Sequence, residues 1–148
     1  MLTNHQKNIA TFIHLSTFSR FIIPLGNFIG PIILWVLNKD KSEFIDKHGK
    51  QAINFQMSIL LYAIIIGTLT IPLFIFKLFS GIDFIDFHGF HDFHINIGKP
   101  SPLLYIGGFL GAFAVLAFIL ELVFIVIASL KARDGAYYNY PFTINFLK

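Results

Sequence analysis

Four apolar segments alternate with polar stretches along the chain. The apolar segments cover residues 9–23, 24–37, 52–79 and 102–130, and the polar stretches are a loop at 38–51, a loop at 80–101 and a tail at 131–148. The last two apolar segments exceed the roughly 20 residues that a helix needs to cross a bilayer. We therefore predict an all-α fold, a polytopic membrane helical bundle with four membrane segments and no sheet, in a single domain over residues 1–148.

The first two segments are short, and Pro24-Leu25-Gly26-Asn27 predicts a break between them. Non-helical backbone at membrane depth is tolerated only where it is buried in protein or lines water. Three arrangements fit: one kinked span, a tilted or re-entrant hairpin, or a surface helix followed by a short span. The pattern alone does not choose among them.

The distribution of basic residues predicts the orientation, because cytoplasmic loops carry an excess of Lys and Arg. The loop 38–51 holds four lysines, and the tail holds Lys131, Arg133 and Lys148. The loop 80–101 holds a single lysine beside Asp83, Asp86 and Asp92. We expect a multi-pass protein of the inner (cytoplasmic) membrane with both termini cytoplasmic and the loop 80–101 outside.

Composition supports this picture. The chain is 55% hydrophobic and 13% charged, about half the charged share of a soluble domain. Its net charge of +3 comes from scattered residues without a basic stripe, which excludes a nucleic-acid partner. The expected partners are the lipid bilayer and other membrane proteins or a second copy of the chain.

Glu121 lies inside the last apolar segment, ten residues before Lys131 and so roughly 15 Å deep. Acidic side chains at such depth usually face a partner or a cavity. The candidate partners are Arg20, His14, Asn54 and Gln56. Glu121 is interpreted in one of two ways. The first, which we favour, is a structural tie between helices or a protonated carboxyl that donates one hydrogen bond, and the second is part of a proton or cation relay.

Two further patterns concern contacts between helices. Gly26 with Gly30, and Gly107 with Gly111, are small-xxx-small pairs that let helix backbones approach closely, and we favour packing within the monomer over dimerisation. Residues 51, 54, 58 and 62 form a polar stripe on one helical face. This stripe is expected to line a cleft or to bond across to the first segment.

His88, His91 and His94 recur at every third position in the loop 80–101, close to three aspartates. Imidazole and carboxylate ligands suit a divalent metal such as Zn, Cu or Ni. The alternative, which we favour, is a loop that lies at the headgroups with its regularly spaced Phe residues in the interface. No other cofactor is expected, and since no nucleophile and base stand in a recognisable motif, we do not expect an enzyme.

The ordered motifs also carry a resemblance to a known family. They are His14-Leu15-Ser16, Pro24-Leu25-Gly26-Asn27, Gly30-Pro31-Ile32-Ile33-Leu34-Trp35, the run from Lys39 to Ala52, Asn54-Phe55-Gln56, Lys131-Ala132-Arg133-Asp134-Gly135 and Tyr140-Pro141-Phe142. Together they resemble the Tic-twenty-like family of short prokaryotic membrane proteins, a domain of unknown function distantly similar to the small membrane subunit of the chloroplast protein-import translocon. The resemblance implies four membrane helices and does not include the His-rich loop.

These observations favour an accessory or scaffold subunit of a membrane protein complex, in protein translocation or in assembly. A small oligomeric transporter or channel that uses Glu121 is the first alternative. A metal-binding module built on the His-rich loop is the second.

Overall fold

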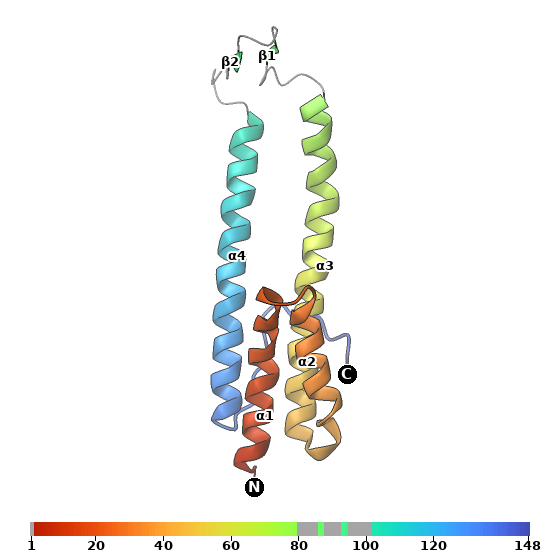
Figure 1. Ribbon diagram of the computed structural model, residues 1–148, viewed down its shortest axis with the longest axis vertical. Coiled ribbons are helices and arrows are strands. Elements are labelled where there is room, and N and C mark those ends of the chain that lie inside the picture. Colours follow the sequence, from red (N-terminus) through yellow and green to blue (C-terminus); the bar gives the residue numbers. More distant parts are fainter. Residues whose placement is uncertain (1, 80–85, 88–92, 95–101) are drawn as a thin grey trace. The chain divides into compact units, whose positions relative to one another are not determined.

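The computed structural model describes residues 2–79, 86–87, 93–94 and 102–148. In chain order its elements are α1 (Asn4–Leu15), η1 (Ser16–Phe21), α2 (Gly26–Val36), η2 (Lys39–Lys41), α3 (Glu43–Phe79), β1 (Asp86–Phe87), β2 (Phe93–His94) and α4 (Pro102–Arg133) (Figure 1). Four α-helices contain most of the described residues, which confirms the all-α prediction. The strand pairing found in this part of the chain is a ladder of two residues per strand, too small to shape the fold.

Two of the four helices are able to cross a membrane. The candidate spans are Glu43–Pro72 in α3 and Tyr105–Arg133 in α4. The other two helices contain 12 and 11 residues, which gives each less than about 20 Å of length against a hydrocarbon core of about 30 Å. The prediction of four membrane segments is therefore not supported, because the apolar residues at 9–23 and 24–37 fold into helices too short to span.

Most side chains of the two candidate spans are not buried by the protein. Only 33% of the most apolar window of α3 and 11% of that of α4 is buried. Phe109 is 73% exposed and Leu69 65% exposed. A core helix of a soluble protein would hide such residues, whereas apolar surface of this extent on a stable protein indicates a membrane environment.

The N-terminal helices begin and end where the sequence offers local hydrogen bonds. Thr3 and Gln6 form a capping box at the start of α1, with the Gln6 amide donating to Thr3 Oγ1 at 3.2 Å. The hydroxyls of Ser16 and Ser19 each donate to the carbonyl three residues earlier, where the chain tightens into η1. Leu25 adopts a left-handed conformation (φ 59°) immediately before α2, so the predicted break is a sharp turn between η1 and α2.

The chain divides into two compact units, residues 1–62 with 119–148 and residues 63–118. In the first unit, α1, η1 and α2 lie beside the beginning of α3 and the end of α4 (Figure 1). Its core consists of small clusters that join these elements; one contains Phe55, Ile125, Ala128 and Tyr140, and another contains Ile13, Ile45 and Ala52. The second unit comprises the rest of α3 and α4 with the β1–β2 ladder.

The two glycine pairs differ in their surroundings. A Cβ on Gly26 would come within 2.4 Å of the Ser19 backbone, and one on Gly30 within 2.6 Å of the Ser16 carbonyl oxygen. A Cβ on Gly111 would meet nothing within 4 Å, and Gly107 lines an apolar groove in the second unit. Packing within the monomer therefore accounts for the first pair, whose glycines let α2 lie directly against η1.

Candidate functional site

Four side chains from four elements meet in a cluster that we call the polar centre: Arg20 of η1, Asn27 of α2, Gln56 of α3 and Glu121 of α4. Arg20 Nη1 donates to Glu121 Oε2 at 3.0 Å, and Arg20 Nη2 donates to Oε1 at 2.5 Å. Gln56 Oε1 accepts from Arg20 Nη2 at 3.0 Å and from Asn27 Nδ2 at 2.8 Å. The polar centre thus joins every helical element of the first unit except α1 and η2.

The two charged side chains of the polar centre are mostly buried, and they form an ion pair with each other. The Glu121 side chain is 6% exposed and that of Arg20 is 20% exposed. A guanidinium that holds both oxygens of a carboxylate is the strongest common geometry for such a pair. Gln56 Nε2 approaches Glu121 Oε1 at 3.3 Å as a further donor. Among the candidate partners of Glu121, the structure therefore brings Arg20 and Gln56 to it and places His14 and Asn54 elsewhere.

His14 belongs to a separate buried chain of hydrogen bonds. Its Nε2 lies 2.8 Å from Nδ1 of His48, and its Nδ1 lies 2.9 Å from the hydroxyl of Tyr140. Burial, together with the neighbouring His48, lowers the pKa of His14 to about 3. Burial raises the pKa of Tyr140 well above 10, with Tyr138 and Glu121 adding to the effect. At neutral pH this chain is uncharged, and it links α1, α3 and the tail.

Sequence reasoning missed the roles of His48 and Tyr140. A weak signal exists for His48, because it shares the helical face of Phe44 and Gln51 at spacings of four and three residues. No local signal predicts Tyr140, since its partner His14 lies 126 positions away.

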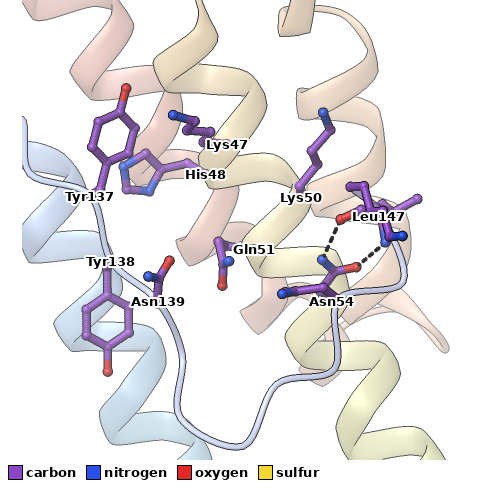
Figure 2. Close-up of a pocket in the computed structure, with 11 residues that line it drawn as sticks. Lys47, His48, Lys50, Gln51, Asn54, Tyr137, Tyr138, Asn139 and Leu147 are labelled. Atoms are coloured by element: carbon purple, nitrogen blue, oxygen red, sulfur yellow. Dashed lines mark hydrogen bonds between the residues drawn. The ribbon is translucent and has the colours of Figure 1, made fainter.

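Asn54 belongs to the polar stripe, which binds the C-terminal tail. The side-chain amide of Asn54 donates to the Leu147 carbonyl at 3.0 Å and accepts from the Leu147 amide at 2.8 Å (Figure 2). Ser58 Oγ accepts from the Ile144 amide at 2.8 Å, and the Tyr62 hydroxyl donates to the Phe142 carbonyl at 2.7 Å. All four contacts of Asn54, Ser58 and Tyr62 are to tail backbone and not to the first segment, and we call residues 142–147 the strap. Gln51 and Asn54 also line a pocket beside the tail.

The predicted metal ligands fall mostly outside the described residues. His88 and His91 lie there, and His94 is in β2. Within the described ranges, no group of three or more His, Cys, Asp or Glu side chains is arranged to hold a metal ion. The metal hypothesis for the loop 80–101 stays a prediction.

Comparison with known proteins assigns the chain to a family. The model of the MamF/MmsF family, described as the magnetosome magnetite crystal formation protein family, matches residues 5–147. The chain belongs to the MamF/MmsF family. No curated protein and no solved structure matches it.

Membership in the MamF/MmsF family corrects the Tic-twenty-like resemblance, which was wrong. All the motifs quoted for that resemblance lie within the matched residues 5–147. The chain is a small membrane protein of a magnetosome family, and a role in protein translocation is not supported.

Proposed function

We propose that this MamF/MmsF protein is a non-enzymatic accessory membrane protein in the formation of magnetosome magnetite crystals. It acts through contacts with other membrane proteins or with further copies of itself. The observation that carries the proposal is the family match, which extends over residues 5–147. The large apolar surface of α3 and α4 supports residence in a membrane.

The polar centre favours this role over that of a transporter or channel. A relay through Glu121 needs a carboxylate that can release its partner and accept a proton or a cation. Both oxygens of Glu121 are already held by Arg20, at 3.0 and 2.5 Å. Separating a buried ion pair leaves uncompensated charge and costs about 3–5 kcal/mol. The geometry therefore supports a fixed tie between helices.

The test uses a magnetite-forming bacterium from which the resident MamF/MmsF gene has been deleted. Electron microscopy measures crystal number and length after complementation with the wild-type chain, and the same cells supply material for co-purification in mild detergent. We expect restored crystal dimensions and reproducible membrane-protein partners or self-association. A chain that leaves the crystals unchanged and purifies alone, crosslinked to nothing, would overturn the proposal.

A second candidate function is metal binding by the loop 80–101. The family description favours it, because magnetite is an iron oxide and iron accepts imidazole and carboxylate ligands. Anaerobic calorimetry with Fe²⁺, and separately with Zn²⁺, would compare the wild type with His88→Ala/His91→Ala/His94→Ala. We expect the variant to lose binding, and equal heats from the two proteins would end this hypothesis.

A further inference from the structure

A polar pocket of about 440 Å³ opens within the first unit, between the start of α3 and the tail. Figure 2 shows the α3 side chains on one wall and the tail residues Tyr137, Tyr138 and Asn139 on the other. Three lysines line it, Lys47, Lys50 and Lys148, and none of the lining side chains is acidic. The strap closes one end, where Leu147 is bonded to Asn54.

The position of this pocket along α3 matches the edge of a bilayer. The charged residues of the first turns of α3 end at Lys50, and a long apolar stretch begins at Ala52. Tyr137 and Tyr138 on the facing wall are residues typical of the membrane–water interface. A basic pocket at this level is where lipid headgroups bind membrane proteins.

The two lysines on α3 have hydrogen-bonding capacity to spare. Lys47 pairs with Glu43 at 2.8 Å, and Lys50 pairs with Asp46 at 2.6 Å. Each ammonium carries three N–H donors and uses one in these contacts. The remaining donors, together with Lys148, suit an anion such as a phosphate diester.

Two buried polar atoms of the pocket residues have no hydrogen-bond partner: Nε2 of His48 and Oε1 of Gln51. The backbone of Ala136 interacts with the His48 ring, but Nε2 still lacks a hydrogen bond of good geometry. A buried polar atom left unpaired costs roughly 1–3 kcal/mol. His48 Nε2 is able to donate to a phosphate. Gln51 Oε1 only accepts, so a ligand with a hydroxyl or amine donor is able to satisfy it.

We propose that this pocket binds the headgroup of an anionic phospholipid with a free hydroxyl, of the phosphatidylglycerol type. The phosphate diester contacts the lysines and His48, and the headgroup hydroxyl donates to Gln51. The alkyl chains leave the pocket toward the apolar surface beyond Lys50. This site goes beyond a role in crystal formation and does not depend on it.

The experiment measures lipid affinity of the purified full-length chain by native mass spectrometry from mild detergent. The probes share acyl chains and differ in headgroup: phosphatidylglycerol, phosphatidylethanol (the same charge without the hydroxyl) and phosphatidylcholine. We expect phosphatidylglycerol to bind at least ten-fold more tightly than phosphatidylcholine. We also expect it to bind at least about three-fold more tightly than phosphatidylethanol. Equal affinity for phosphatidylglycerol and phosphatidylcholine would overturn the proposal.

Two matched double variants test whether the charge acts locally. Lys47→Gln/Lys50→Gln should weaken phosphatidylglycerol binding at least five-fold, whereas Lys39→Gln/Lys41→Gln, outside this pocket, should change it less than two-fold. Equal losses would assign the effect to diffuse surface charge and refute a site. Binding of inorganic phosphate as tightly as phosphatidylglycerol would likewise refute a headgroup site, because it would identify free phosphate as the ligand.

Gln51→Met tests the hydroxyl contact with little change in volume. It should abolish the preference for phosphatidylglycerol over phosphatidylethanol and leave phosphatidylethanol binding within two-fold of wild type. A preserved preference would contradict the assignment of the hydroxyl to Gln51. Because the substitution is nearly isosteric, it keeps the proposal testable even if the lysine variant does not fold.

Discussion

The sharpest test of the polar centre is to remove its two charges singly and together. Glu121→Leu leaves the Arg20 guanidinium without the carboxylate that it holds through two hydrogen bonds. Removing one partner of a buried pair costs about 3–5 kcal/mol, and the 20% exposure of the Arg20 side chain places the expected loss near the lower end. We expect about 3 kcal/mol from either Glu121→Leu or Arg20→Leu. The double variant buries no charge there and should lose only about 1 kcal/mol.

The assay is the free energy of unfolding in mixed detergent micelles, with membrane insertion checked separately by fractionation. Insertion should survive Glu121→Leu, because the flanking apolar segment is long enough to insert by itself. The double variant should lose about 5 kcal/mol less than the sum of the single losses, the sign of direct coupling. Arg20→Lys serves as a charge-retaining control with an intermediate loss. Additive single and double effects would refute the idea that the pair ties the helices together.

Three further predictions concern other parts of the first unit. Gly26→Ala should destabilise the protein by about 1–3 kcal/mol, because the added Cβ would lie 2.4 Å from the Ser19 backbone. The control is Gly111→Ala, whose Cβ would meet nothing within 4 Å and which should leave the stability of the monomer nearly unchanged. Thermal melts in detergent compare the two variants. For His14, whose folded pKa of about 3 is below the unfolded value of 6.5, the unfolded state takes up the proton first. The free energy of unfolding should therefore be highest above pH 6.5 and decrease between pH 6.5 and 3, by up to about 1.4 kcal/mol per pH unit. His14→Phe should reduce this pH dependence. Asn54→Leu should release the strap and speed proteolysis after Tyr140 at unchanged helicity by circular dichroism.

The spans were predictable, because a long apolar run with charged ends is a property of local sequence. Glu121 was also predictable as a buried group, because it is an acidic residue inside such an apolar run. Its partners were only partly predictable: Arg20 and Gln56 contact it, and His14 and Asn54 do not. Their distances along the chain gave no means of ranking them, since the fold of the short N-terminal helices decides which side chains reach α4.

The N-terminal region shows why apolar content alone overcounts membrane spans. The sequence 9–37 is apolar enough for two segments, but Pro24 and Leu25 divide it into pieces too short to cross. The Ser16 hydroxyl donates to the Ile13 carbonyl, and the single proton of the Ser19 hydroxyl is shared between the Ser16 and Gly26 carbonyls, each 2.6 Å from Oγ. These bonds close a tight turn that a hydropathy profile does not register.

The strap explains why a membrane helix carries Asn54, Ser58 and Tyr62 on one face. Tyr62 lies eleven residues beyond Gln51, which is roughly 16 Å along α3. The Phe142 carbonyl that it binds is non-helical backbone at that depth. Such backbone is tolerated in a bilayer only when the protein satisfies its polar groups, and the stripe does so at Phe142, Ile144 and Leu147. The polar side chains of Asn54, Ser58 and Tyr62 are thus explained by contacts with the protein's own tail and require no conduction path along α3.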